Sequence, residues 1–430
     1  MMKIQRILHM VLFHLVGCVC SFSSPAFVSS TRTLLHSSSG DNSNDWMESL
    51  RARQLELDQQ QESLENKWRN SKCESTMPLT FPDWVRRLDV GDYPIVAVGS
   101  SSGNVYCANL ETGQAIAKSV DQEEEEPLAG QEELMRILFS GYDGGGTLAI
   151  SMYKTLICSA SRQGSVQLWR LDASEPAELI SQGTLQALQG VLVTCLELDD
   201  EYLWVGTADG RVQAYTHQSK ELPLALQMKP ELEWNLGSAI LSLSLCPEMG
   251  HGVVTTAKGT VELFSLEDDD AMVAKWRPPF ESTVRQSPNC YILSCAMVPY
   301  KEEGGGYTMV CGCSDGTMYV QPLNYENGMF VDDDCKLKAL KATGPSYRQL
   351  QPQHSGLIKC LTSPVPGVML SGGQDGSLRV WDISEDDSHY LYQFVGDKVW
   401  LGTLWTDGTR IVSDGPDNTI IVHDFSGAEQ

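Results

Sequence analysis

The residues that most often carry catalysis are spread along the chain without the spacing that catalysis requires. Histidines could act as bases or metal ligands, but His217, His251, His389 and His423 are isolated from one another in the sequence. No GxSxG elbow, HExxH pair, phosphate-binding loop or CxxC pair accompanies them. The sequence therefore predicts no catalytic residue, and we expect a protein that is not an enzyme.

Acidic residues gather in short runs, namely Glu123 to Glu126, Asp268 to Asp270 and Asp332 to Asp334. Such runs are typical of solvated loops, although a divalent cation could gather at one of them. With no set of ligands at metal-binding spacing, we predict neither a metal site nor a cofactor.

The thirteen cysteines are likewise scattered, and Cys18 and Cys20 belong to the extreme N-terminus. The strand-like apolar runs contain Cys107, Cys158, Cys195, Cys295, Cys311, Cys313 and Cys360. A free thiol in such a run behaves as a small buried hydrophobe. We expect reduced cysteines and a reducing final compartment.

The chain is strongly acidic, with 31 basic and 56 acidic residues among 430 and a net charge of −25. A surface of this sign repels the phosphate backbone, so nucleic acid is excluded as an expected partner.

The first 40 residues have the composition of a targeting sequence. Lys3 and Arg6 precede an apolar run, Ile7 to Cys20, that ends in small residues, as in a secretory signal, and the run is short for a bilayer span. Residues 22–40 are rich in hydroxyl side chains, with one arginine and no acid.

This two-part segment resembles the bipartite plastid presequences of algae with secondary, red-lineage plastids. The resemblance implies import into a plastid. No second apolar signal follows, which favours the stroma or the stromal thylakoid surface, with plain secretion or an uncleaved anchor as alternatives. After removal of the presequence we expect no integral membrane span, while peripheral association with a membrane stays open.

Residues 41–72 predict a helix, because Asp45 to Asn70 contains no Gly or Pro. Leucines repeat every seven residues and companion positions complete one stripe, which comprises Met47, Leu50, Gln54, Leu57, Gln61, Leu64 and Trp68. The helix could form a coiled coil, dock on a partner, or lie on the protein's own surface.

From residue 73 onward the chain repeats one unit. Its clearest copy runs from Leu357 to Asp382 and reads as strand, loop, strand, Asp-Gly turn and strand. Seven copies have a turn residue at Gly103, Gly164, Gly210, Gly259, Gly316, Gly376 and Asn418.

An apolar strand precedes each turn copy, at Val85 to Val90, Thr147 to Met152, Val193 to Leu198, Ile240 to Leu245, Ile292 to Val298, Ile358 to Ser363 and Val399 to Trp405. A more polar fourth strand follows most copies. The chain ends one strand short, and the segment between about Cys73 and Pro82 could close the ring. We therefore predict an all-β fold, a seven-bladed β-propeller of four-stranded antiparallel blades over residues 73–430, preceded by a short α-helix and a disordered presequence.

The repeat resembles the WD-repeat, transducin beta-like family over about 350 residues. His354, Ser371, Asp375 and Trp381 stand at that family's structural His, Ser/Thr, Asp and Trp positions, and the resemblance implies a hydrogen-bonded network rather than a catalytic one. Other copies depart from the motif, with Tyr215, Phe264 and Tyr319 in place of the tryptophan.

Basic residues stand at three consecutive turn tips, Arg162, Arg211 and Lys258. In the resembled family these turns open on a face that commonly binds partner peptides, which suggests a partner-binding arc. Chance exposure of basic residues at turn tips is the alternative.

The resemblance implies a non-catalytic scaffold or adaptor for other proteins. One alternative is an enzyme or small-ligand-binding propeller that uses its central channel. The inner strands VTCLEL, ILSLSL and ILSCAM look almost wholly apolar, which disfavours that alternative. A ubiquitin-ligase substrate receptor is a second alternative, but no F-box is evident and the presequence points away from the cytosol.

Overall fold

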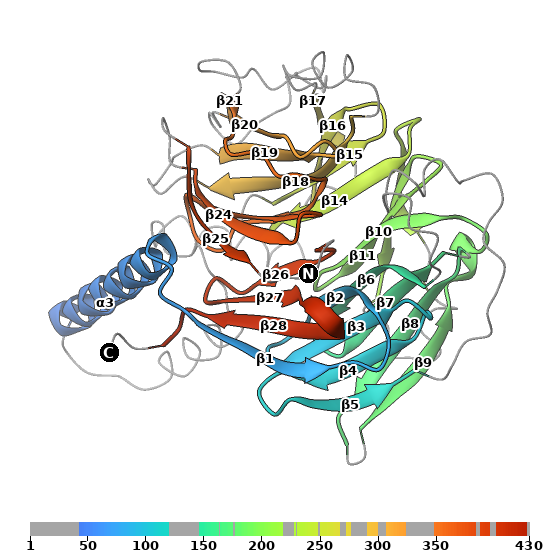
Figure 1. Cartoon of the computed structure of the whole chain (residues 1–430), viewed down its shortest axis with the longest axis horizontal. Coiled ribbons are helices and arrows are strands. Elements are labelled where there is room, and N and C mark those ends of the chain that lie inside the picture. The colour runs from blue at the N-terminus through green and yellow to red at the C-terminus, as the bar shows by residue number, and fades with distance from the viewer. Residues whose placement is uncertain are drawn as a thin grey trace. The chain divides into compact units, whose positions relative to one another are not determined.

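The chain folds into seven four-stranded antiparallel sheets arranged as the blades of a propeller (Figure 1). The computed structural model describes residues 43–119, 146–162, 164–174, 177–217, 228, 230–247, 250–266, 272–276, 290–299, 307–323, 348–383, 388–395 and 401–427. The predicted fold class is confirmed. The presequence and the acidic runs at 123–126, 268–270 and 332–334 lie outside the described residues.

Six blades use consecutive strands, and each pairs them in sequence order. Blade 1 contains β2 (Val85–Val90), β3 (Ile95–Ser100), β4 (Val105–Asn109) and β5 (Gln114–Lys118). Blade 2 contains β6 (Thr147–Tyr153), β7 (Leu156–Ser161), β8 (Val166–Asp172) and β9 (Glu178–Thr184). Blade 3 contains β10 (Val193–Leu198), β11 (Tyr202–Thr207), β12 (Arg211–Thr216) and β13 (Pro230–Asn235).

Blade 4 contains β14 (Ile240–Cys246), β15 (His251–Thr256), β16 (Val261–Ser265) and β17 (Met272–Trp276). Blade 5 contains β18 (Ile292–Pro299), β19 (Tyr307–Cys313), β20 (Met318–Leu323) and β21 (Arg348–Gln349). Blade 6 contains β22 (Ile358–Thr362), β23 (Val368–Gly373), β24 (Ser377–Asp382) and β25 (His389–Val395). Two short 3-10 turns, η1 (Gln186–Leu188) and η4 (Pro416–Asn418), lie in connections.

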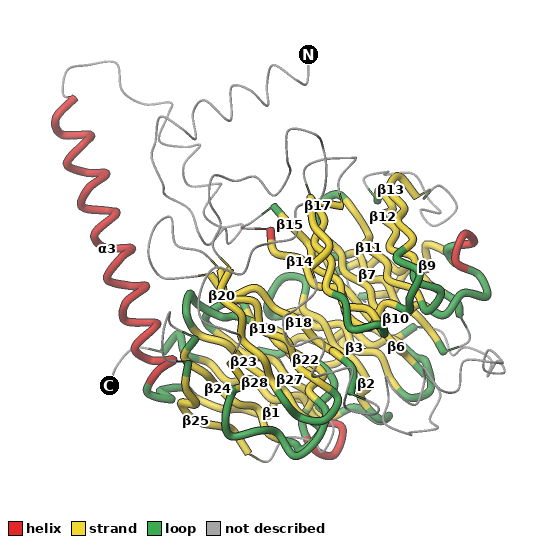
Figure 2. Tube along the Cα trace, turned by 90° about the horizontal axis from the view of Figure 1, so that it is seen from above, coloured by secondary structure: helices red, strands yellow, loops and turns green. Residues whose placement is uncertain are grey.

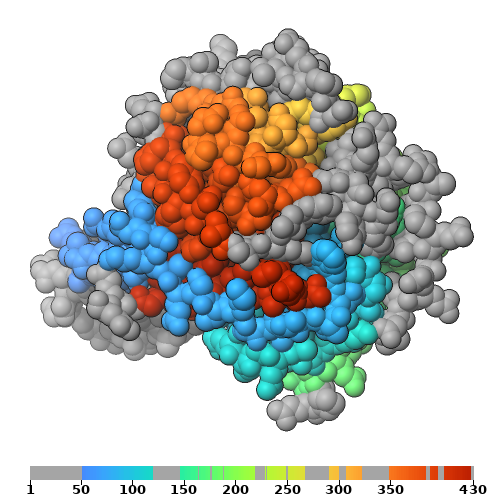
Figure 3. Space-filling model, viewed as in Figure 1, coloured from blue at the N-terminus to red at the C-terminus, as the bar shows by residue number. Residues whose placement is uncertain are grey.

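Blade 7 joins the two ends of the propeller. It contains β26 (Leu404–Thr406), β27 (Arg410–Asp414) and β28 (Thr419–Asp424), and β1 (Glu74–Thr80) pairs with β28 from Glu74 opposite Asp424 to Thr80 opposite Thr419. The N-terminal segment therefore supplies the missing strand, as its position predicted, and lies against the red C-terminal strand in Figure 3. Closure leaves no open blade between the first and last repeats.

The innermost strand of blade 7 is shorter than predicted. The prediction of a strand from Val399 to Trp405 is wrong for Leu401 to Thr403, while residues 399 and 400 lie outside the described part. The Asp414 carboxylate accepts hydrogen bonds from the backbone N–H groups of Gly402, at 3.0 Å, and Thr403, at 3.2 Å. A side chain thus replaces strand pairing there.

The tight turns follow the predicted pattern closely. All seven predicted turn residues have positive φ, between +63° for Asn418 and +92° for Gly210. This region favours glycine because a Cβ atom crowds the backbone. At Gly316 an added Cβ would also lie 2.1 Å from the carbonyl oxygen of His354, so both the backbone conformation and the lack of space require glycine there.

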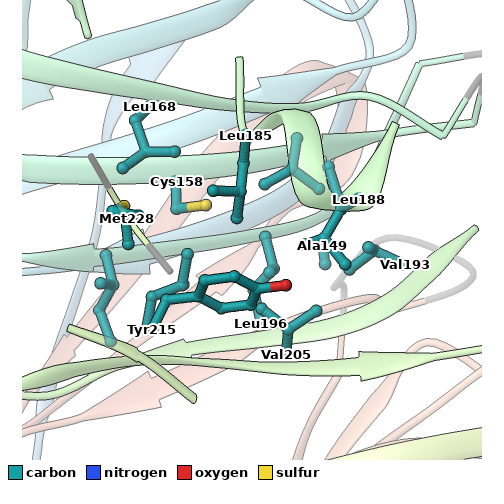
Figure 4. Packing of buried hydrophobic residues seen from close by; sticks show 14 of the residues in the cluster. Ala149, Cys158, Leu168, Leu185, Leu188, Val193, Leu196, Val205, Tyr215 and Met228 are labelled. Atoms are coloured by element: carbon teal, nitrogen blue, oxygen red, sulfur yellow. The ribbon is translucent and has the colours of Figure 1, made fainter. Parts of the chain in front are cut away.

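Apolar side chains from the facing surfaces of adjacent blades form the core. Between blades 2 and 3, Cys158 and Leu168 pack with Leu196, Val205 and Tyr215, all at most 5% exposed (Figure 4). Burial of this kind between successive blades holds the ring together, because no blade can cover both of its own faces.

Helix α3 spans Ser43–Arg69 and appears as one uninterrupted helix in Figure 2. The predicted helical range was 41–72. Residues up to Leu64 fall in one compact unit, and Glu65–Arg69 belong with the propeller in the other. No helix within the described residues is long and apolar enough to cross a membrane.

Candidate functional site

The most complete repeat motif lies in blade 6 and forms a buried hydrogen-bond network. His354 Nε2 lies 2.8 Å from Ser371 Oγ, and His354 Nδ1 lies 3.0 Å from Asp375 Oδ1. Trp381 donates from Nε1 to Ser371 Oγ at 2.8 Å. Burial lowers the pKa of His354 despite the neighbouring Asp375 carboxylate. The histidine is therefore mainly neutral, and its two ring nitrogens lock the turn to the sheet.

The other blades build their turns from different partners. In blade 3, Asp209 accepts a hydrogen bond from Thr207 and pairs with Arg211. In blade 2, Trp169 donates to Ser159 Oγ at 3.3 Å, a longer contact than its counterpart in blade 6. A common turn geometry is thus held by several side-chain solutions, which explains why the motif fades between repeats.

The three predicted partner-binding residues differ in how they are held. Arg211 Nη2 and Nε both lie 2.8 Å from Asp209 Oδ2. Lys258 is exposed, and its Nζ donates to the carbonyl oxygen of Gly237 at 2.7 Å. Arg162 is half-buried. Within the described residues, Lys258 and Arg211 are engaged by their own chain, so only a partner that competes with these contacts could use them fully.

Four charged side chains on the inner strands meet around the axis of the ring, and we call Arg87, Asp89, Glu197 and Lys359 the axial cluster. All four are half-buried. Asp89 of blade 1 raises the pKa of Glu197 of blade 3, although blade 2 lies between them. The Cys195 thiol of blade 3 is among the groups that act on the pKa of Lys359 of blade 6. These blades are not neighbours in the ring, so the groups act on one another from separate inner strands.

Burial perturbs the titration of this axial cluster strongly. It raises the pKa of Glu197 to about 8, with the Asp89 charge adding to the effect. It also raises the pKa of Asp89 to about 6, against hydrogen bonds from Met152 N, at 2.7 Å, and two further donors. Burial and Arg87 lower the pKa of Lys359 to about 7. Three groups therefore change charge near neutral pH, which is common at functional sites.

Asp89 also has a structural role. It accepts from Ser151 Oγ at 3.1 Å, and Ser151 Oγ in turn accepts from Leu198 N at 2.9 Å. These bonds link blades 1, 2 and 3 at the axis. Glu197 has no hydrogen-bond partner among the described residues, so no structural role within the fold explains its presence in the axial cluster.

The axial cluster was not predicted from the sequence. The inner strands VTCLEL, ILSLSL and ILSCAM look almost wholly apolar, but VRRLDV and IKCLT contain Arg87, Asp89 and Lys359. Glu197 stands within VTCLEL itself. Comparing the charged residues at matching positions of all seven inner strands would have found the convergence.

The predicted histidines do not converge in the described structure. His217 Nε2 lies 2.8 Å from the carbonyl oxygen of Asp199, and His423 Nδ1 lies 2.6 Å from Ser75 Oγ in blade 7. Burial lowers the pKa of His423 to about 4. His251 begins β15 and His389 begins β25, in separate blades.

Ten cysteines fall among the described residues, and all are free thiols there. Cys290, Cys313 and Asp315 place their ligand atoms within 4.8 Å of one another in blade 5. The sequence predicted no metal site, because it shows no set of ligands at metal-binding spacing. Cys290 is far from Cys313 in the chain, and only strand pairing brings the two together.

Comparisons with known proteins add no family for this chain. No family model matches the sequence. No curated protein matches it either. Among solved structures, the chain is similar to the crystal structure of the computationally designed Ika8 protein in crystal packing No.1 in P63, with 17% identity and a TM-score of 0.47 over 81% of this chain and 99% of that one. The assignment of seven four-stranded blades rests on the strand pairing described above.

Proposed function

We propose that this chain is a non-catalytic, protein-binding scaffold of the WD-repeat type that works inside a plastid. A closed ring of blades presents many loops on a rigid frame, and such a frame commonly serves protein interaction. The blade 6 network of His354, Ser371, Asp375 and Trp381 supports the WD-repeat assignment.

The observation that carries the proposal is the anchoring of the end of α3. Trp68 is fully buried, its ring stacks on Phe425 with centroids 3.8 Å apart, and its Nε1 donates to the carbonyl oxygen of Gly408 at 2.8 Å. Tyr392 donates from its hydroxyl to the Trp68 carbonyl oxygen at 2.5 Å. A helix fixed this firmly at one end is suited to presenting its remaining turns to a partner.

Charged neighbours of Trp68 strengthen the anchor. Arg69 pairs with the buried Asp382 of blade 6. Lys67 Nζ donates to the carbonyl oxygen of Gly427 at 2.5 Å, beyond the last strand. The helix end therefore binds blade 6 and blade 7, the blade in which β1 closes the ring.

The turns before the anchor have the features of a docking helix. Leu57, Gln61 and Leu64 of the predicted stripe are half-buried, whereas Leu55 is 59% exposed. Ser43–Leu64 lie in the compact unit that is distinct from the propeller. The stripe is interrupted by glutamine, which favours a modest, selective interface over a long coiled coil.

The plastid address rests on the two-part composition of the first 40 residues and on the reduced cysteines. Fusing residues 1–40 to a fluorescent protein in an alga with a secondary plastid tests it directly. We expect fluorescence within the plastid. Fluorescence in the secretory pathway or outside the cell would contradict the address.

Proximity labelling from a C-terminal fusion of the full chain tests the scaffold role. We expect a reproducible set of labelled plastid proteins that is unchanged when Glu197 is replaced by Gln, because binding uses the surface and α3. A charge-reversal triple variant at Arg162, Arg211 and Lys258 tests the turn tips, and loss of partners is expected only if those tips take part. Absence of any enriched protein would contradict the scaffold.

The axial cluster favours a second candidate function, the binding of a small ligand at the ring axis. Glu197 without a hydrogen-bond partner among the described residues, with Lys359 across the axis, could bind a molecule that carries both a donor and an anionic group. A thermal-shift screen of metabolites against wild type and Glu197→Gln distinguishes the two functions. A metabolite that stabilises the wild type but not the Glu197→Gln variant would support ligand binding at the ring axis.

A further inference from the structure

Strand pairing in blade 5 places two thiols beside a turn carboxylate. Cys313 is the last residue of β19, and it lies opposite Ile292, the first residue of the neighbouring strand β18. Tyr291 N donates to Ser314 Oγ at 2.9 Å, and Ser314 N donates to the Tyr291 carbonyl oxygen at 2.9 Å. These bonds fix Cys290, the residue before Tyr291, next to the turn.

The carboxylate is oriented by its own turn. Asp315 Oδ1 accepts from Thr317 N at 3.0 Å and from Thr317 Oγ1 at 2.6 Å. The other oxygen, Oδ2, has no hydrogen-bond partner among the described residues. Ligand atoms of Cys290, Cys313 and Asp315 all lie within 4.8 Å of one another, a spacing that fits a single ion held by two thiolates and one carboxylate.

Comparison with blade 6 shows what this cluster replaces. There, Ile358 pairs with Gly373 as Ile292 pairs with Cys313, so Gly373 is the counterpart of Cys313 and Asp375 that of Asp315. A Cβ atom at Gly373 would lie 2.3 Å from His354 Nδ1. A cysteine fits at this position only where no histidine fills the space.

The sequence of blade 5 makes that exchange. His354 stands four residues before β22, whereas Pro288 stands four residues before β18. The third strand of the blade also changes at the position four residues after the turn aspartate. In blade 6 this residue is Arg379, opposite Ser371 in the strand register, and in blade 5 it is Tyr319, opposite Cys311. The positively charged partner of the turn aspartate in blade 6 is therefore replaced in blade 5 by an uncharged tyrosine.

Charge balance then distinguishes the turn of blade 5 from the turns of blades 3 and 6. Asp375 is paired with Arg379, and Asp209 is paired with Arg211. Within the described residues no basic side chain pairs with Asp315. A cation bound between the carboxylate and the two sulfurs would supply the missing charge, as the basic side chains do in blades 3 and 6.

The exposure of the three ligands is graded from the interior to the surface, which gives an ion a path to the site. Cys313 is fully buried, Cys290 is half-buried and Asp315 is exposed. Metal binding displaces the thiol protons, as thiol ligands of zinc routinely require.

We propose that Cys290, Cys313 and Asp315 form a zinc site that replaces the histidine lock of blade 6 and fastens the turn of blade 5. Zn²⁺ binds the two sulfurs and Oδ2 of Asp315, and water at the exposed side completes four-coordination. Binding releases the two thiol protons to solvent, with no change of oxidation state. The ion takes the place of the side-chain contacts that hold the turns of blades 3 and 6.

The experiment measures metal in the full chain purified under reducing conditions. We expect one zinc per chain by mass spectrometry of the metals. Replacement by Co²⁺ should give the near-ultraviolet sulfur-to-cobalt absorption and the visible bands of a tetrahedral thiolate site. Removal of the metal by a chelator should lower the melting temperature of the wild type, and added Zn²⁺ should restore it.

Variants assign the ligands. Cys313→Ser should abolish the cobalt spectrum, and Asp315→Asn, which keeps the Thr317 acceptor but loses the charge, should weaken zinc binding by at least about tenfold. Cys295→Ala removes a buried thiol of the same blade outside the cluster and should leave zinc content unchanged. A chain without stoichiometric zinc and without a cobalt thiolate spectrum overturns the proposal, as does a Cys290–Cys313 disulfide in the native protein.

Discussion

Replacing Trp68 gives the sharpest test of how α3 is held. The indole has no exposed surface, stacks on Phe425 and donates to the Gly408 carbonyl oxygen. Trp68→Ala removes all of these contacts and leaves a cavity, which costs about 3–5 kcal/mol in cores. Trp68→Phe keeps an aromatic ring on Phe425 but loses the hydrogen bond, at a cost of about 1 kcal/mol.

Urea unfolding followed by circular dichroism measures both variants, and hydrogen exchange of residues 65–69 and 419–427 reports whether the anchor opens locally. Trp84 is a matched control, because it is 40% exposed, and Trp84→Ala should cost at most about 1 kcal/mol. A Trp68→Ala variant within about 0.5 kcal/mol of wild type, with unchanged exchange, would refute the anchoring argument.

Three further predictions concern the axis, the closure and the blade 6 lock. Glu197 has a raised pKa, so the folded state binds a proton that the unfolded state releases, and stability should fall as pH rises from about 4.5 to about 8. Glu197→Gln should remove the part of that fall above about pH 6 and leave the part below it, which Asp89 contributes, whereas the exposed Glu178→Gln should leave the whole fall unchanged. Deleting residues 73–82 should lower the melting temperature sharply, and an unchanged value would disprove ring closure by β1. Trp381→Phe should cost about 1 kcal/mol in urea unfolding through the lost bond to Ser371, and no measurable loss would contradict the lock.

The fold was predictable because local signals repeat. A glycine or asparagine between two apolar strands marks each tight turn in the sequence, and all seven predicted turn residues adopt positive φ. The inner strand of blade 7 was mispredicted because the Asp414 carboxylate, from the neighbouring strand β27, accepts the backbone hydrogen bonds of Gly402 and Thr403. Such substitution leaves no periodic signal.

The candidate sites were less predictable because they exist only after the ring closes. Glu197 and Asp89 interact across a blade that separates them in sequence, and each looks like an ordinary polar residue in its own strand. Cys290 precedes β18 and Cys313 follows it by a strand and a loop, so no motif spacing joins them. Trp68 was placed on the helical stripe, but nothing in the sequence marked it as the residue that docks on the propeller.

The central claim, that this propeller holds other proteins through α3, is tested most directly by comparing proximity labelling from two helix variants in the native cell. The first variant replaces Leu57 and Leu64 of the stripe with Gln, and the matched control replaces the exposed Glu56 and Glu62 with Gln on the same helix. We predict that the stripe variant loses a defined set of plastid partners and that the control retains them. Identical labelling in both variants, or no enriched partner in the wild type, would contradict the account.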